Sequence, residues 1–255
     1  MKAAIVQSQI DFYRQNGYLI YEGLFATKEA DKLNRYIRRH ANSDFAALVN
    51  PDRYEKLSEQ DERPKSDIVL EEIKETADYC RLIMKSPNIV SILDAINGKE
   101  IVGLSSQFIY KEAYSIYSSQ AWNTHQDSWY PGDKNGEYVT ANWFLKNADK
   151  ENGTIYLYPG SHKLGLLDAT PNKSFRENPN ANPGSECRVP DSFVDKKVDI
   201  VLSENSVVFM HGYLIHGSYP NNSERSRPWY SCCYISKGED FLVGKNANRI
   251  VIPLR

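Results

Sequence analysis

The sequence predicts a mainly β fold, a sandwich or barrel with α-helices packed outside it. From Ile101 onward, short runs rich in Tyr, Phe, Val and Ile alternate with turns rich in Gly, Asn, Pro and Ser. Residues 1–100 carry helix signals instead. The chain has 255 residues, 41% of them hydrophobic and 12% aromatic, which is enough for one large core. We therefore expect one domain over residues 1–255, with a largely helical part at 1–100 and a β core at 101–255.

The first part contains the signals of several helices and one short strand. Prolines and polar caps mark helix starts, and glycines mark stops because they readily adopt the left-handed conformation that ends a helix. The expected elements are an amphipathic helix before Gly17, a strand at 17–21, a helix capped by Thr27 with an apolar stripe at Ala30, Leu33, Tyr36 and Ile37, a helix after Asp67, and a helix from Pro87 to Gly98.

The second part is expected to be a series of strands interrupted by one long insertion. The expected strands are 101–110, 120–130, 138–146, 153–158, 198–210, 213–219, 228–236 and 248–254. The insertion, 165–197, is polar and has little periodicity. It could be a surface loop or a lid over a pocket, since loops of this length often serve function.

Charge and composition indicate a small partner. Lys and Arg number 31 and Asp and Glu 33, so there is no basic footprint for nucleic acid and no polybasic patch for a membrane surface. The N-terminal apolar run is too short for a secretory signal, and no segment has the length of a membrane span. We expect a cytoplasmic protein with a small-molecule substrate and four reduced cysteines. No heptad or interface pattern indicates an oligomeric state.

The stretch WNTHQDSWY, residues 122–130, carries one half of a possible metal site. In a strand, alternate side chains share a face, so His125 and Asp127 could converge on one point. A histidine and an aspartate alone could equally form a hydrogen-bonded structural pair. A metal site therefore requires a distant third ligand.

The stretch SVVFMHGYLIHGSYPNNSERSRPWYSCCY offers two candidates for that ligand, His211 and His216. If the turn Pro220–Ser223 folds the flanking strands into a hairpin, His216 lies opposite Arg227, and Ser218 shares its face. Two histidines and a carboxylate form the facial triad of non-haem Fe(II) oxygenases, which leaves positions open for a 2-oxo acid and O2. Arg227 could then bind the far carboxylate of that acid through its planar fork.

Three blocks of the chain resemble the phytanoyl-CoA dioxygenase family of Fe(II)/2-oxoglutarate oxygenases, relatives of ectoine hydroxylase. They are His125-Gln126-Asp127, GTIYLYPGSHKLG at 153–165 and VVFMHGYLIHGSYPNNSERSRPWY at 207–230, in this order. The opening FYRQNGYLIYEGLF is similar to the N-terminal helix and strand of the family. The resemblance therefore covers most of the chain.

The resemblance implies a double-stranded β-helix, the cupin-like jelly roll, with Fe(II) between its two sheets. It also implies hydroxylation of a C–H bond with O2, in which 2-oxoglutarate is converted to succinate and CO2. The carboxylate at 127 favours hydroxylation or desaturation, because related halogenases have a small residue there. The implied site residues are His125, Asp127 and His216 as metal ligands, and Arg227, Ser218 and Trp143 beside the cosubstrate.

Substrate-binding residues are expected on the strand before the H-x-D block and just after it: Gln107, Lys111, Trp129 and Tyr130. Core packing is the alternative for the aromatic ones. Two other functions stay open for the whole chain. One is a catalytically silent cupin-like metal-binding protein, and the other is a metalloenzyme of the same barrel that does not use 2-oxoglutarate.

Overall fold

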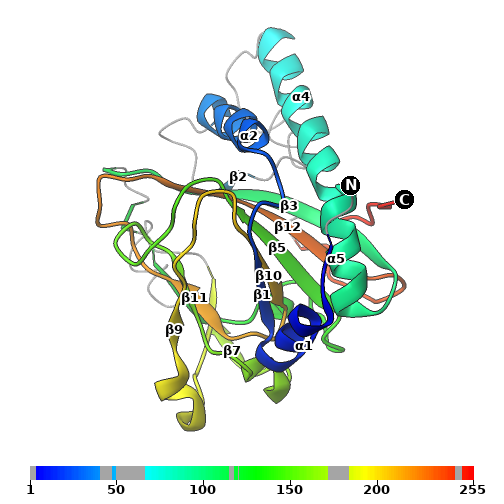
Figure 1. Cartoon of the computed structure of the whole chain (residues 1–255), viewed down its shortest axis with the longest axis vertical. Coiled ribbons are helices and arrows are strands. Elements are labelled where there is room, and N and C mark those ends of the chain that lie inside the picture. Colours follow the sequence, from blue (N-terminus) through cyan, green and yellow to red (C-terminus); the bar gives the residue numbers. More distant parts are fainter. Residues whose placement is uncertain are drawn as a thin grey trace.

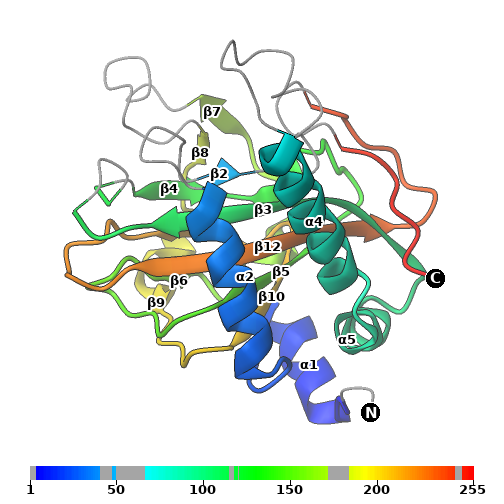
Figure 2. The same ribbon diagram turned by 90° about the horizontal axis from the view of Figure 1, so that it is seen from above.

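Two antiparallel sheets pack face to face, and helices cover the outer face of the larger sheet (Figures 1 and 2). The computed structural model describes residues 4–40, 48–49, 67–114, 118–119, 121–171, 184–244 and 249–255. The α-helices within these ranges are α1 (Gln7–Asn16), α2 (Thr27–His40), α4 (Asp67–Met84) and α5 (Pro87–Asn97). None of them is both long enough and apolar enough to cross a membrane. The expected jelly roll with flanking helices is confirmed.

The larger sheet has six strands in the order β1-β10-β5-β12-β3-β2, and the smaller has four in the order β4-β11-β6-β9. The strands of the larger sheet are β1 (Tyr18–Tyr21), β2 (Leu48–Val49), β3 (Ile101–Lys111), β5 (Tyr138–Phe144), β10 (Val207–His211) and β12 (Arg227–Ser236). Those of the smaller sheet are β4 (Trp122–His125), β6 (Ile155–Leu157), β9 (Val198–Asp199) and β11 (His216–Ser218). Strands β7 (Ala169–Pro171) and β8 (Ser185–Cys187) form a separate pair.

Alternate residues of the central strands enter two different cores, because the larger sheet is covered on both faces. Every residue of β5 and β12 is buried. On β12, Tyr230 and Tyr234 face the helices and donate hydrogen bonds to the Cys80 and Met84 carbonyls of α4, at 3.1 and 3.0 Å. Trp229, the residue before Tyr230, points to the opposite face and packs in the core between the two sheets. Side-chain direction along these strands therefore decides which residues can reach the interior.

The helix boundaries follow the sequence signals closely. Gly17 and Gly98 end α1 and α5 in the left-handed conformation, with φ of 81° and 71°. Thr27 is the first residue of α2, and Ala30 and Leu33 of the predicted stripe are buried. The side chains of Tyr36 and Ile37 lie outside the described part of the chain.

Several strands are shorter than expected. The predicted strand 120–130 ends at His125 and continues as a 3₁₀ turn at Asp127–Trp129. The predicted strand 198–210 is two strands, β9 and β10, in different sheets. Near the C-terminus, the described part of 248–254, residues 249–254, contributes one bridge, between Ile252 and Gly103. Of the insertion, β7, β8 and a 3₁₀ turn at Asp191–Lys196 are described, whereas 172–183 lie outside the described residues.

The predicted hairpin between β11 and β12 is wrong. These strands lie in different sheets: His216 pairs with His125 of β4, and Arg227 pairs with Lys111 of β3. His211 pairs with Val139 of β5. Residues 219–226 therefore cross from one sheet to the other. A chain that has to bridge two packed layers cannot close a tight turn, even though Pro220–Ser223 has turn composition.

Candidate metal centre

Strand β11 brings the third ligand to the H-x-D motif. Because β11 lies beside β4, His216 and His125 are direct partners, and their rings are 4.2 Å apart between centroids. Asp127 follows in the 3₁₀ turn, with Oδ1 3.6 Å from Nε2 of His125 and 3.7 Å from Nε2 of His216. One donor atom from each of these three residues lies within 4.8 Å of the other two. This geometry fits one metal ion.

Hydrogen bonds orient both imidazoles toward that point. The Nδ1 atoms of His125 and His216 lie 2.7 Å from the Asn123 carbonyl and 2.9 Å from the Leu214 carbonyl. A carbonyl only accepts, so each Nδ1 carries the proton and each Nε2 keeps a free lone pair beside Asp127. Thr140 of β5 donates to Oδ2 of Asp127 at 3.4 Å. The sequence contained no signal for Thr140, because it comes from the opposite sheet.

Gln126 stabilises the change of direction between His125 and Asp127. Its amide nitrogen donates to the carbonyls of Gly165 and Tyr213, at 2.9 and 2.7 Å, and its amide oxygen accepts from the Leu167 backbone at 2.7 Å. With three bonds in a buried position, this side chain is fully satisfied. The middle residue of the motif is therefore structural.

The electrostatics of the three ligands suit a divalent metal. Burial, reinforced by the neighbouring His125, lowers the pKa of His216 to about 4, so this imidazole is neutral at neutral pH. Burial alone would raise the pKa of Asp127, but His216, His125 and Thr140 together hold it below its usual range. Two imidazoles and one carboxylate form the donor set that non-haem Fe(II) sites use.

Two buried cations lie at the other end of β11. Arg227 is fully buried, and none of its three guanidinium nitrogens has a hydrogen-bond partner in the described part of the chain. Its guanidinium lies 4.4 Å from the centre of the Trp229 ring. Burial lowers the pKa of Arg227 to about 9, which leaves it charged at neutral pH. A buried cation without a partner is costly, so the Arg227 guanidinium is suited to bind an anion.

Lys111 is the second cation. It is the direct strand partner of Arg227 and is also buried. Its ammonium donates to Oγ of Ser218 at 2.8 Å and to the Tyr219 carbonyl. Burial, and then repulsion from Arg227, push its pKa well below the usual range. Within the described residues neither cation forms an ion pair with a carboxylate, so an anion here would meet two positive charges and a hydroxyl.

Trp143 lies away from this arrangement. It is on the helix-facing side of β5 and stacks on Phe25, with ring centroids 4.1 Å apart. Its neighbours Asn142 and Phe144 face the other sheet instead: Asn142 donates to Thr140, and Phe144 packs in the core between the sheets. Strand alternation sends adjacent side chains to opposite faces, so Trp143 lies on the face opposite to that of Asn142 and Phe144, and its position beside the cosubstrate stays a prediction.

Replacing Trp143 by leucine should therefore lower stability without changing the site. The change leaves a cavity beside Phe25, and large-to-small core substitutions of this size cost about 3 kcal/mol. We expect a lower midpoint in urea unfolding but an unchanged affinity for 2-oxoglutarate in the folded protein. A large loss of that affinity at unchanged stability would place Trp143 at the cosubstrate after all.

Of the other predicted substrate-binding residues, Tyr130 is the one whose ring contact with a triad residue is described. Gln107 faces the interior opposite Ser231 and is the one residue of β3 that is not buried. The Tyr130 ring lies 6.0 Å from the His125 ring, and Trp129 is 42% exposed. The end of the insertion packs here too, since Thr124 donates to the Cys187 carbonyl of β8 at 2.8 Å.

Comparison with known proteins places the chain in a family. The family model described as "Phytanoyl-CoA dioxygenase (PhyH)" matches residues 13–229. The peroxisomal phytanoyl-CoA dioxygenases of Bos taurus and Homo sapiens are 25% identical over 239 residues and 23% identical over 243 residues. These alignments cover 88% and 89% of this chain and 66% and 68% of the relatives. The chain thus spans about two thirds of the length of these curated relatives.

Solved structures share the fold. The epimerase SnoN, in complex with Fe3+, alpha ketoglutarate and nogalamycin RO, has a TM-score of 0.69 at 18% identity, with 98% of each chain covered. The alpha ketoglutarate dependent carbocyclase SnoK from nogalamycin biosynthesis has a TM-score of 0.65 at 17% identity, with 98% of this chain and 95% of SnoK covered. Since the family model covers most of the sequence and the jelly roll is shared, the chain belongs to the phytanoyl-CoA dioxygenase family of Fe(II)/2-oxoglutarate-dependent oxygenases.

Proposed function

We propose that this chain is a non-haem Fe(II)/2-oxoglutarate-dependent dioxygenase that oxidises a C–H bond of a small molecule, with hydroxylation as the expected outcome. The proposal rests on one observation: strand β11 contributes one residue to the metal-ligand cluster and another to the buried cation site. His216 belongs to the three-ligand cluster, and Ser218, two residues on, contacts the buried cation Lys111. A dianion with a chelating end and a second carboxylate matches this combination of a metal position and a cationic one.

The donor set fits Fe(II), with His125, Asp127 and His216 as the residues that would hold it. Fe(II) bound there supplies the oxidation of a substrate C–H bond by O2, coupled to conversion of 2-oxoglutarate to succinate and CO2. The hydrogen bonds to both Nδ1 atoms keep the Nε2 lone pairs directed at the metal position. Thr140 holds the Asp127 carboxylate in place.

Arg227 is proposed to bind the far carboxylate of 2-oxoglutarate through its planar fork. Its three unpartnered nitrogens fit this function, and the apolar rings of Trp229 and Phe144 exclude water around it. Lys111, expected from the sequence to bind substrate, is proposed instead to share the cosubstrate carboxylate with Arg227 and Ser218. When the anion binds, its attraction to Lys111 and Arg227 offsets the repulsion between these two cations.

Gln107, Trp129 and Tyr130 are proposed to contact the primary substrate; the Tyr130 ring lies 6.0 Å from the His125 ring, Gln107 is the part-exposed residue of β3, and Trp129 is exposed. The names of the curated relatives concern phytanoyl-CoA, but this chain spans about two thirds of their length. The proposal therefore stays at a small molecule. The cytoplasmic location expected from the sequence also stays a prediction, and the named relatives are peroxisomal.

Succinate release tests the proposal. Protein loaded with Fe(II) is incubated with 2-oxoglutarate, O2 and a panel of small molecules, and succinate and oxidised product are measured by mass spectrometry. We expect a substrate that yields equal amounts of succinate and a product heavier by one oxygen atom. The matched control is the His216→Ala variant, which should yield neither. A metal-dependent product formed without 2-oxoglutarate would favour the metalloenzyme alternative, and metal binding without any turnover would favour the silent one.

A further inference from the structure

The crossover from β11 to β12, residues 219–226, connects two parts of the proposed cosubstrate site. It begins after Ser218, which contacts Lys111, and it ends at Arg227. Lys111 and Arg227 repel each other. The contacts that hold residues 219–226 against the end of β3 therefore act against this repulsion. The strands themselves do not join Ser218 to Arg227, since β11 and β12 lie in different sheets.

Asn221 lies at the centre of this crossover and uses both ends of its side-chain amide. Its nitrogen donates to the Lys111 carbonyl at 3.0 Å and to the Arg225 carbonyl at 2.8 Å. Its oxygen accepts from the backbone nitrogen and the hydroxyl of Ser223, at 3.0 and 2.9 Å. The residue is 4% exposed. A buried amide with this many partners is a specific connection between the end of β3 and the crossover.

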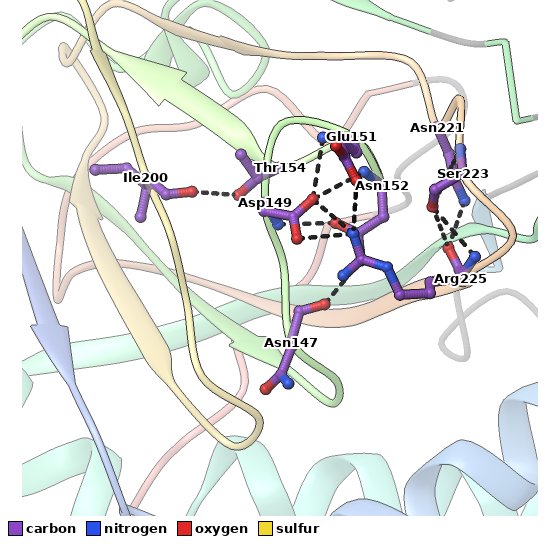
Figure 3. A network of polar contacts seen from close by, with 9 residues as sticks. All are labelled: Asn147, Asp149, Glu151, Asn152, Thr154, Ile200, Asn221, Ser223 and Arg225. Atoms are coloured by element: carbon purple, nitrogen blue, oxygen red, sulfur yellow. Dashed lines mark hydrogen bonds and ion pairs between the residues drawn. The ribbon is translucent and has the colours of Figure 1, made fainter.

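The turn at 149–154 supports the same crossover from the other side (Figure 3). The backbone nitrogens of Tyr219 and Asn222 donate to the carbonyls of Thr154 and Glu151, at 3.0 and 2.8 Å. Gly153 has a φ of +90°, and a Cβ there would lie 2.8 Å from the Tyr219 carbonyl and 3.0 Å from Cδ of Lys111. The close approach to the cation site therefore requires glycine at 153.

An ion pair also joins this turn to the crossover, but it is exposed. Figure 3 shows Arg225 directed at Asp149 and Glu151, with nitrogen–oxygen distances of 2.8 and 3.4 Å. The Arg225 side chain is 47% exposed, and surface pairs of this kind contribute little because water screens them. Of the crossover's side chains, Asn221 is the one that is both buried and bonded to Lys111.

We propose that Asn221 is a positioning residue for cosubstrate binding, which rests on the proposed function. By tying the Lys111 carbonyl to the crossover, it sets the spacing of Lys111, Ser218 and Arg227 before an anion arrives. It touches neither the metal position nor the cosubstrate position itself. Its loss should weaken 2-oxoglutarate binding and leave Fe(II) binding intact.

The sequence contains a matched control in the next residue. Asn222 is exposed, and its side chain makes no hydrogen bond in the described part of the chain. The affinity of the Fe(II)-loaded protein for 2-oxoglutarate is measured anaerobically by calorimetry for Asn221→Ala, Asn222→Ala and Arg225→Ala, together with the Fe(II) affinity and the melting temperature of each. For Asn221→Ala we expect 2-oxoglutarate to bind about tenfold more weakly, while the Fe(II) affinity changes by less than about twofold. Both controls should bind 2-oxoglutarate as the wild type does.

A structural function alone would give a different result. In that case Asn221→Ala lowers the melting temperature, but the folded protein binds 2-oxoglutarate with wild-type affinity, and the inference is overturned. Gly153→Ala is a second variant that disturbs the same contact from the other side, and it should weaken 2-oxoglutarate binding in the same selective way. Wild-type protein that binds no 2-oxoglutarate would refute the proposed function instead, so the two failures are distinguishable.

Discussion

Replacing His216 by alanine is expected to abolish Fe(II) binding, whereas replacing His211 is expected to spare it. His216 belongs to the cluster with His125 and Asp127, and the substitution removes one of three ligands. His211 lies at the end of β10, where its Nδ1 accepts a hydrogen bond from the Tyr213 backbone at 3.0 Å and its ring packs 5.0 Å from that of His162. Anaerobic titration of Fe(II) into each variant measures the difference.

The His211→Ala variant also controls for general damage. Burial lowers the pKa of His211 to about 4, so it is a neutral, largely buried side chain whose removal can cost stability. A melting temperature that falls while Fe(II) affinity persists is the expected pattern for His211. Loss of Fe(II) binding in His211→Ala together with retention in His216→Ala would mean that the three-ligand cluster is not the metal site.

Replacing Arg227 by alanine should raise the KM for 2-oxoglutarate by about a hundredfold or more. Removing one partner of a buried charge pair commonly costs 3–5 kcal/mol, and about 1.4 kcal/mol corresponds to a factor of ten. The matched control is Arg225→Ala, because Arg225 is two residues earlier, carries the same group and is exposed. Initial rates of succinate formation at varied 2-oxoglutarate give the KM values.

The stability of the Arg227 variant distinguishes a binding function from a structural one. Without an anion, the wild-type protein buries an unpartnered cation, so Arg227→Ala should not lower the melting temperature of the metal-free protein. An unchanged KM would contradict the proposed function of Arg227 and favour a metalloenzyme that does not use 2-oxoglutarate. Arg227→Lys should restore only part of the affinity, because an ammonium lacks the planar fork.

Local signals in the sequence predicted the helices well and the strand pairing poorly. Gly17 and Gly98 end helices because of their own conformational freedom, which is a property of the residue. The choice between a hairpin and a crossover at Pro220–Ser223 depends on which sheet receives β12, which no local signal contains. The predicted hairpin was wrong, but the residue that it favoured, His216, does lie in the cluster. In the structure His216 pairs with His125 of β4 and not with Arg227 of β12.

The positions of several residues around the site also depend on strand register, which the sequence does not show locally. The H-x-D motif was visible in the sequence, and the resemblance to the family implied His216 as its third partner; the structure brings the three residues together in one cluster. Trp143, Lys111, Thr140 and Asn221 could not be placed in this way. Which face Trp143 occupies, and which sheet lies opposite Thr140, follow only from the register of β5 with its neighbours.

The most direct measurement is anaerobic addition of 2-oxoglutarate to the Fe(II)-loaded protein while the visible spectrum is recorded. We expect the weak charge-transfer band of a chelated 2-oxo acid in the wild type, and its loss in Arg227→Ala at the same 2-oxoglutarate concentration. Fe(II) binding without any such band at saturating 2-oxoglutarate would contradict the account, because the metal site would then exist without the cosubstrate that Arg227 is proposed to bind.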